Sequence, residues 1–167
     1  VGRTYAGVDG YCPLAAYLGT QGFCLELALR PGTQHSVSET EYNIERVLPL
    51  AARVCSAPLL FRADSGFDSA KLMCAIGQQA KALAREVAFI IKWNPRTTPV
   101  ECIAAARVAD ASTAWTVLRE GKRECLWSQT VEIAHAGQTL NARRVYRLSE
   151  RTIDKRGQQM LMPEYTL

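Results

Sequence analysis

The amino-acid sequence predicts an α/β protein, in which a mixed sheet with helices on both faces is followed by a β-rich region. Two patterns lead to this prediction. Over residues 1–99, apolar runs alternate with helical periodicities, as in strands joined through helices. Over residues 100–167, short β-prone runs are separated by glycine-containing turns. A chain of 167 residues with 48% hydrophobic and 22% charged residues is large enough to bury a core.

The first predicted elements are a hairpin and a helix. Residues 11–18 and 23–29 are apolar runs joined by a glycine-bounded link, which is typical of a β-hairpin. Ser38 and Glu41 have the spacing of a capping box, in which each side chain bonds a free amide of the first helical turn. Apolar residues then recur at helical spacing, and Pro49 within them predicts a kink or a new start of the helix.

A strand, a helix and a second strand follow. Residues 59–63 are a short apolar strand, and residues 68–85 show the periodicity of a helix capped by Asp68 or Ser69. Residues 87–91 are the best candidate for a central strand, because every one of them is apolar.

The second half is predicted to be mostly antiparallel sheet after a short helix at 100–108. Its expected strands cover residues 114–118, 124–133, 142–148 and 159–165. This half is also the more basic. Residues 93–167 carry 11 basic and 8 acidic groups, whereas residues 1–92 carry 9 and 8. The net charge of +4 permits a nucleic-acid partner without requiring one.

Composition argues against several classes of protein. The six cysteines are scattered without metal-ligand spacing, which indicates reduced thiols and a cytoplasmic protein. His35 and His135 are far apart, so a histidine metal site is not expected. No apolar run approaches the length of a membrane span, and no secretory leader is visible, so we expect no membrane partner. The chain does not begin with Met, and we expect it to be part of a longer protein.

Asp64 is the principal candidate for a functional residue. An apolar strand ends at this carboxylate, and Gly66 follows before the next helix. Such an aspartate can present oxygen to a metal ion at the carboxyl end of a strand. It can equally form the loop and cap the following helix. The local pattern favours neither interpretation.

Three segments resemble one known family. They are the run from Val1 to Gly19, which contains Gly7-Val8-Asp9-Gly10-Tyr11, then Leu29-Arg30-Pro31-Gly32-Thr33-Gln34-His35, and Leu60-Phe61-Arg62-Ala63-Asp64-Ser65-Gly66-Phe67. In this order and spacing they are similar to the DDE group 1 domain of bacterial insertion-sequence transposases, which has an RNase H-like core. The resemblance covers residues 1–96 and extends more loosely to residue 167.

The resemblance implies both a fold and an activity. Residues 1–99 would be an incomplete RNase H-like mixed sheet with flanking helices, and residues 100–167 a β-rich insertion. Asp64 would be the second carboxylate of an Asp-Asp-Glu triad, catalytic and a ligand of Mg²⁺ or Mn²⁺. The family's first Asp would precede residue 1, and its Glu would follow residue 167. The whole protein would perform metal-dependent DNA cleavage and strand transfer, whereas this chain alone would be inactive.

Other acidic residues are weak substitutes for the rest of the triad. Asp9 precedes a glycine and is explained by a turn. Glu150 and Glu164 lie in strand-like or turn-like sequence and not on a long helix.

DNA, as transposon ends and as target, is the expected partner, and a second copy of the chain is a further candidate. Lys92 and Arg96 follow the last strand of the first half, and Arg143, Arg144 and Arg147 belong to a basic run. Arginines on an exposed strand can also form an ordinary solvated face. The tryptophans are better explained by core packing than by base stacking.

Two rival interpretations stay open. The chain could be a non-catalytic transposase remnant that binds DNA or a partner chain through its basic β region. It could also be an unrelated α/β hydrolase or phosphatase in which Asp64 is the nucleophile.

Overall fold

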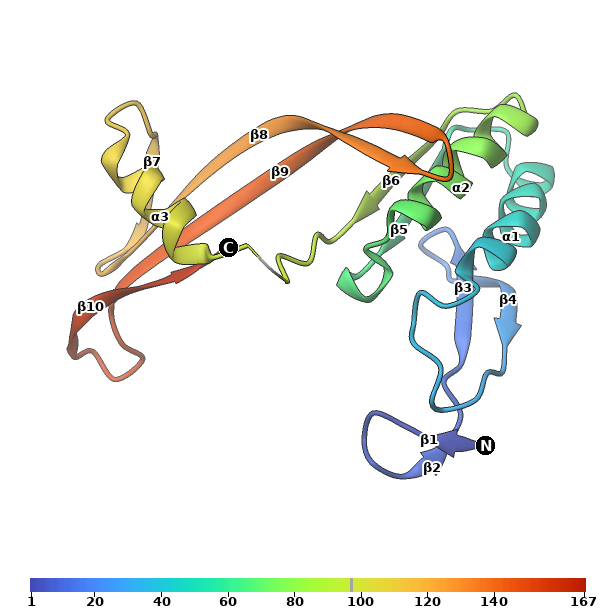
Figure 1. Cartoon of the computed structure of the whole chain (residues 1–167), viewed down its shortest axis with the longest axis horizontal. Helices are drawn as coiled ribbons and strands as arrows, with labels where there is room; N and C mark the ends of the chain where they lie inside the picture. The colour runs from blue at the N-terminus through green and yellow to red at the C-terminus, as the bar shows by residue number, and fades with distance from the viewer. Residues whose placement is uncertain (97) are drawn as a thin grey trace. The chain divides into compact units, whose positions relative to one another are not determined.

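The computed structural model of the protein describes residues 1–96 and 98–167, and it has a mixed α/β architecture (Figure 1). The chain forms two compact units. Unit 1 comprises residues 1–94 and 132–140, and unit 2 comprises residues 95–131 and 141–167. The first boundary therefore falls at residue 94, where the sequence predicted 99, and a short segment from the second half of the chain belongs to unit 1.

Two hairpins begin unit 1. Strands β1 (Gly2–Arg3) and β2 (Asp9–Gly10) pair in antiparallel fashion, and so do β3 (Leu14–Leu18) and β4 (Phe23–Ala28). The second pair confirms the predicted hairpin. Its link is bounded by glycines with φ of 71° and 73°, a conformation that other residues rarely adopt.

A parallel strand pair with two helices completes the main part of unit 1. The elements are α1 (Thr40–Val54), β5 (Leu59–Ala63), the 3₁₀ turn η1 (Ser65–Phe67), α2 (Ala70–Ala82) and β6 (Val87–Ile91). Strands β5 and β6 run parallel in a register that joins Leu59 to Val87 and Ala63 to Ile91. The carboxyl ends of the two strands therefore lie at the same edge.

Helices α1 and α2 cover one face of β5 and β6. Ile44, Leu72 and Ile76 of the helices are buried together with Leu59, and Phe61 packs against them. The alternate strand residues are exposed; they are Leu60, Arg62, Ala88 and Ile90. The prediction of helices on both faces is therefore wrong. It rested on the alternation of helices with strands along the chain, but here the second face of β5 and β6 is exposed to solvent.

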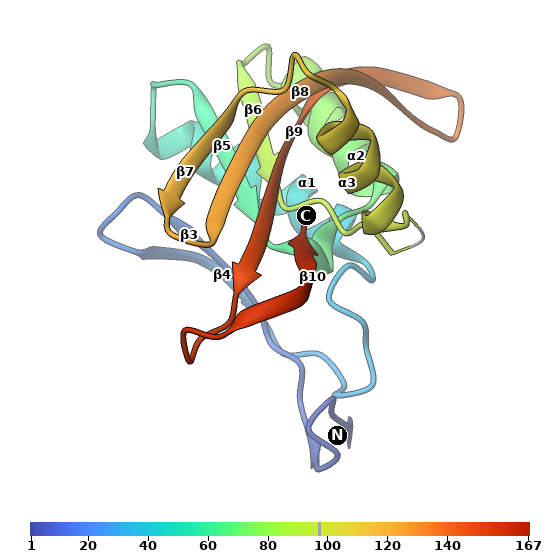
Figure 2. The same cartoon turned by 90° about the vertical axis from the view of Figure 1, so that its left-hand side faces the viewer.

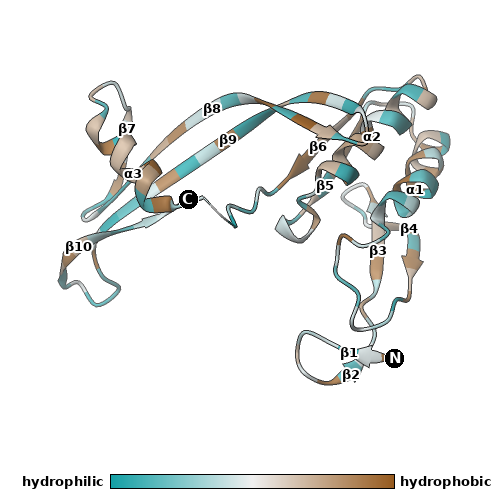
Figure 3. Cartoon of the chain, in the orientation of Figure 1, coloured by the Kyte–Doolittle hydropathy of each residue, from teal (hydrophilic) through white to brown (hydrophobic). Residues whose placement is uncertain are grey.

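The strands of unit 1 form separate two-stranded sheets among the described residues. β3 pairs only with β4, and β5 only with β6. β6 is hydrophobic along its length (Figure 3), yet it is not the central strand that its composition predicted. Composition reports how apolar a strand is and not how many neighbours it has.

The predicted capping box is absent. Helix α1 begins after Glu39, which has φ of 59° and makes no side-chain cap. The carbonyl of Ser38 instead accepts a hydrogen bond from Arg30, and Glu41 forms an ion pair with Lys71 of α2. Pro49 lies inside α1, which continues to Val54 without a new start.

Unit 2 is a four-stranded sheet with one helix. Its elements are α3 (Val100–Ala109), β7 (Trp115–Arg119), β8 (Lys122–His135), β9 (Gln138–Ile153) and β10 (Gln159–Thr166). The strand order is β10-β9-β8-β7, and the registers of β10 with β9 and of β7 with β8 are antiparallel (Figure 2). The prediction of a β-rich second half with a short leading helix is confirmed. The tip of the β8–β9 hairpin, residues 132–140, is the segment that belongs to unit 1.

The core of unit 2 lies between α3 and the sheet. Ala104 of α3 is buried with Cys125 of β8 and Leu148 of β9. The six cysteines are free thiols. Among the described residues, no helix has both the length and the apolar character that crossing a bilayer requires.

Candidate functional site

Asp64 follows β5 directly and is exposed to solvent. Its Oδ1 accepts a hydrogen bond of 2.8 Å from the amide of Gly66, so the side chain caps the η1 turn. Its Oδ2 has no hydrogen-bond partner in the described part of the chain. The two interpretations of the sequence are thus compatible, because one oxygen forms the turn and the other is open.

Lys92 and Asp64 lie at the same edge of the parallel pair. The amide of Lys92 donates to the carbonyl of Ala63 over 3.2 Å, and the Lys92 side chain is exposed. Asp68 is the next carboxylate along the chain, and its Oδ2 accepts from the amide of Asn94 at 2.9 Å. Asp68 therefore ties the chain after β6 to the Asp64 turn.

Arg62 extends the positive charge near this edge. It is in register with Ile90 on the uncovered face of β5 and β6, and it is exposed. No carboxylate within residues 1–96 and 98–167 forms an ion pair with it.

The loop before α1 contacts the Asp64 turn through Ser36. A Cβ placed on Gly66 would lie 3.0 Å from Asp64 Oδ1, 3.3 Å from Ser36 Cβ and 3.4 Å from Ser36 Oγ. Gly66 does not have a left-handed φ, so crowding and not backbone conformation accounts for a glycine here. Sequence reasoning gave Ser36 no role, because it lies 28 positions from Asp64.

The predicted DNA-binding arginines are divided between the two faces of the unit 2 sheet. Arg143 and Arg147 are four residues apart on β9, exposed and on the same face. Arg144 points to the opposite face, is half-buried and has an interaction partner. Arg96 is exposed near the start of unit 2. Two of the three arginines in the basic run thus share an open surface.

The covered face of the unit 2 sheet uses its aromatic residues for packing. Trp127 stacks on Tyr146 with ring centroids 4.8 Å apart and 6° between the planes, and Arg107 lies 4.2 Å from the Trp127 centroid. Arg123 lies 4.3 Å from the centroid of Trp115. These contacts agree with packing and leave Trp127 little free surface for a base.

The acidic residues considered as substitutes for the triad have other partners. Both Glu150 oxygens accept from Arg123 at 2.8 Å, and Tyr165 also donates to Glu150. Burial raises the pKa of Tyr165, and the neighbouring Glu150 carboxylate raises it further. Glu164 pairs with Arg151, and Asp9 lies in the β1–β2 hairpin.

The described residues contain no cluster of three or more His, Cys, Asp or Glu side chains that could hold a metal ion. Asp64 offers one open carboxylate oxygen at an exposed position. Mg²⁺ is often held by only one or two protein carboxylates while it keeps several waters. Asp64 therefore fits the role of one ligand of such an ion and not of a complete site.

No protein-family model matches the chain, and no curated protein and no solved structure matches it either.

Proposed function

We propose that this chain is the central part of the catalytic domain of a DDE transposase, with Asp64 as one carboxylate of the triad. The observation that carries the proposal is the position of Asp64 at the carboxyl end of a parallel strand, with Oδ2 open to solvent. The three segments that resemble the DDE group 1 family include this turn.

The arrangement of unit 1 is consistent with a partial RNase H-like core. An antiparallel hairpin, a helix, a strand, a helix and a parallel strand follow one another. The proposal requires a further strand between β3 and β5, and within residues 1–96 and 98–167 each of these strands has only one pairing neighbour. In the family that strand carries the first aspartate.

The residues around Asp64 suit contact with a phosphodiester. Arg62 and Lys92 are exposed cations that can neutralise phosphate charge near the carboxylate. A bound Mg²⁺ or Mn²⁺ supplies Lewis-acid stabilisation of charge on the phosphate oxygens. Asp64 would be one of its protein ligands, and the family's other two carboxylates would come from outside these residues. In this proposal the 167-residue chain alone neither cuts nor joins DNA.

Paramagnetic broadening by Mn²⁺ tests the role of Asp64. We expect titration of the ¹⁵N-labelled chain with Mn²⁺ to broaden the amide resonances of Asp64, Ser65 and Gly66 first. In Asp64→Asn this broadening should disappear. Asp68→Asn is the matched control, because the Oδ2 of Asp68 is already engaged by Asn94. Broadening that persists in Asp64→Asn, or that centres elsewhere, would contradict the assignment.

A cleavage assay tests the incomplete triad. Supercoiled plasmid incubated with the purified chain and Mg²⁺ should stay uncut. Nicking that depends on Mg²⁺ and is lost in Asp64→Asn would show that this chain holds a complete active site.

A second candidate function is binding of DNA or of a partner chain by a non-catalytic remnant. The exposed pair Arg143 and Arg147 on one face of β9 favours it. DNA binding in EDTA, unchanged by Asp64→Asn and accompanied by no Mn²⁺ effect at Gly66, would support this candidate over the catalytic one.

A further inference from the structure

Arg30 is a buried cation without a carboxylate partner. It is 8% exposed, and in the described part of the chain no acidic side chain forms an ion pair with it. Its Nε donates to the Cys12 carbonyl at 3.2 Å, and its Nη1 donates to the carbonyls of Ser36 at 3.2 Å and Ser38 at 3.0 Å. Burying an arginine on neutral carbonyls costs free energy, so the geometry that Arg30 gives to the segments it joins calls for an explanation.

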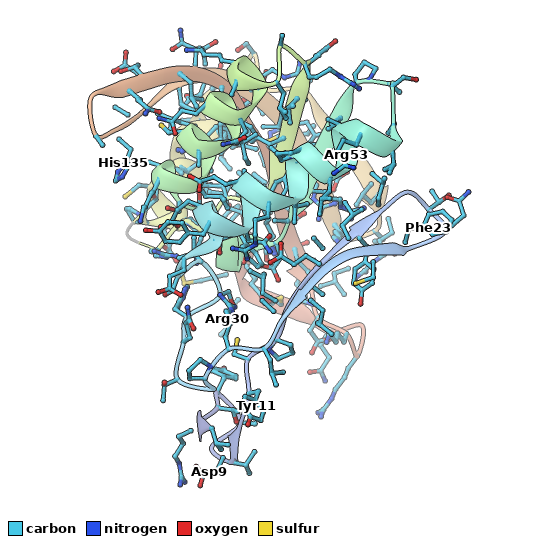
Figure 4. All side chains as sticks on the ribbon, turned by 90° about the vertical axis from the view of Figure 1, so that its right-hand side faces the viewer. Asp9, Tyr11, Phe23, Arg30, Arg53 and His135 are labelled. Carbon is cyan, nitrogen blue, oxygen red and sulfur yellow. The ribbon has the colours of Figure 1, made fainter. Side chains whose placement is uncertain are left out.

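The guanidinium joins two segments of unit 1. Cys12 precedes β3, whereas Ser36 and Ser38 lie in the loop before α1. In Figure 4, Arg30 lies between the N-terminal hairpin, marked by Asp9 and Tyr11, and helix α1. The carbonyl of Ser36 also accepts from the buried Thr40 hydroxyl at 3.0 Å, so Ser36 is held from two sides.

A short chain of contacts leads from Arg30 to Asp64. Arg30 holds the main chain of Ser36, the Ser36 side chain lies against Gly66, and the Gly66 amide donates to Asp64 Oδ1. Ser36 Oγ and Asp64 Oδ1 lie 3.4 Å and 3.0 Å from the same point, the site of a Cβ on Gly66. The Ser36 hydroxyl makes no hydrogen bond within the described residues, so it is free to bind a water or a phosphate oxygen.

We propose that Arg30 is a positioning residue for the Asp64 turn, and that the Ser36 hydroxyl is a second oxygen of the same site. Arg30 fixes Ser36 against Gly66, and this contact fixes the direction of the Asp64 carboxylate. Ser36 then contacts the hydration shell or the phosphate oxygens of a divalent cation held by Asp64. The part of this proposal that involves a cation rests on the proposed function, whereas the positioning of the Asp64 turn by Arg30 does not.

Arg85 supplies a matched control. Like Arg30, it is an arginine that donates to three main-chain carbonyls, those of Ala52, Cys55 and Ala57. These carbonyls lie at and beyond the end of α1, and Arg85 contacts neither Ser36 nor the Asp64 turn. Replacing either arginine with glutamine removes comparable contacts, but only Arg30→Gln should act on Asp64.

The first readout is hydrogen exchange of the Gly66 amide in the full 167-residue chain. We expect Arg30→Gln to accelerate this exchange, Arg30→Lys to accelerate it less, and Arg85→Gln to leave it unchanged. Lysine keeps the charge but cannot reach three carbonyls with a fixed fork. Equal exchange in the two glutamine variants would overturn the positioning role.

The second readout is the Mn²⁺ concentration that half-broadens the Gly66 amide. We expect Arg30→Gln to raise it about tenfold, as loss of a residue that orients a ligand does, and Arg85→Gln to leave it within twofold. Ser36→Ala keeps the loop and should raise it a fewfold. If the half-broadening Mn²⁺ concentration is unchanged in Ser36→Ala, the Ser36 hydroxyl is not part of the site. If Arg30→Gln does not fold, Arg30→Lys and Ser36→Ala decide the proposal.

The two proposals fail in distinguishable ways. Absence of any Mn²⁺ effect on the unmodified chain would refute the metal role of Asp64 and the role of the hydroxyl with it. The exchange of Gly66 would still decide whether Arg30 positions the turn. A normal Mn²⁺ effect that Arg30→Gln does not change would refute the positioning role alone.

Discussion

The two units satisfy their polar groups in different ways. On the covered face of the unit 2 sheet, Glu150 accepts from Arg123 and Tyr165, and Arg107 covers Trp127. In the described part of unit 1, β3 and β5 each belong to a sheet of two strands, whereas the unit 2 sheet has four. The buried atoms Glu26 Oε2 and Asn43 Nδ2 of unit 1 also lack partners, as does Thr113 Oγ1 of unit 2.

Of the three unpaired buried atoms among the described residues, two lie in unit 1, the unit that contains Asp64. Open strand edges and unpaired buried groups in a native fold call for an explanation, and function or a missing neighbour is a common one. Unit 1 combines these features with the open oxygen of Asp64. Unit 2 has the Glu150 network on one face of its sheet and the exposed Arg143 and Arg147 on the other.

The largest expected effect comes from the helical core of unit 1. Ile44 is fully buried among α1, α2 and β5. Ile44→Ala should lower the free energy of unfolding by about 3–4 kcal/mol, measured by urea unfolding with far-UV circular dichroism. Leu60→Ala, on the uncovered strand face, is the control and should change it by less than about 0.5 kcal/mol. Equal effects would mean that the face bearing Leu60 is buried.

The next effect tests the closed network of unit 2. Arg123→Met leaves the buried Glu150 with only the Tyr165 hydroxyl and should cost about 3 kcal/mol. Arg151→Met removes a surface ion pair with Glu164 and should cost less than about 1 kcal/mol. Tryptophan fluorescence under urea suits this test, because two of the three tryptophans, Trp115 and Trp127, belong to unit 2. Similar costs for the two variants would show that the network adds no stability.

The arginine face of unit 2 should determine how DNA affinity depends on salt. Replacing both Arg143 and Arg147 with glutamine should reduce the slope of log K against log salt by about two, roughly one for each lost phosphate contact. Arg144→Gln, on the opposite face, should keep the slope. Fluorescence anisotropy with duplex DNA at several salt concentrations measures both. If only Arg144→Gln reduces the slope, DNA contacts the opposite face of the sheet.

The smallest expected effect is the acid response of the β9–β10 turn. The pKa of Asp154 lies below its usual value of 3.8, because the amide of Gln158 first, and those of Arg156 and Gly157, donate to the carboxylate. The stabilisation is present above pH 3.8 and is lost as the pH falls through the lower folded-state value. The urea midpoint of the unmodified chain should therefore fall more between pH 5 and pH 3 than that of Asp154→Asn. If the urea midpoints of the two proteins fall equally between pH 5 and pH 3, the β9–β10 turn is not a source of acid sensitivity.

Periodicity predicted most of the elements. The apolar runs of β5 and β6, the helical spacing of α1 and the glycine turns of unit 2 are local signals in the sequence. The capping box failed because α1 begins one residue later than its spacing requires, with Glu39 and not Ser38 at the N-cap. Helices on both faces failed because alternation of elements does not determine which side of a sheet a helix covers.

The site could be predicted only in part. Asp64 was recognisable because a carboxylate at a strand end is a sequence pattern. Its contact with Ser36 was not, because it depends on main-chain carbonyls that bind Arg30, and every residue type has a carbonyl. The separation of Arg144 from Arg143 follows from strand alternation, which the sequence-based prediction did not apply to the basic run.

The membership of the β8–β9 hairpin tip in unit 1 has a consequence for synthesis. The chain leaves unit 1 after residue 94 and completes it only at residue 140, so 46 further residues must be made. At about 5–20 residues per second, the nascent chain spends about 2–9 seconds before Leu140 can reach its place beside Gly77 of α2. During that interval the part of α2 around Gly77 is without its neighbour Leu140.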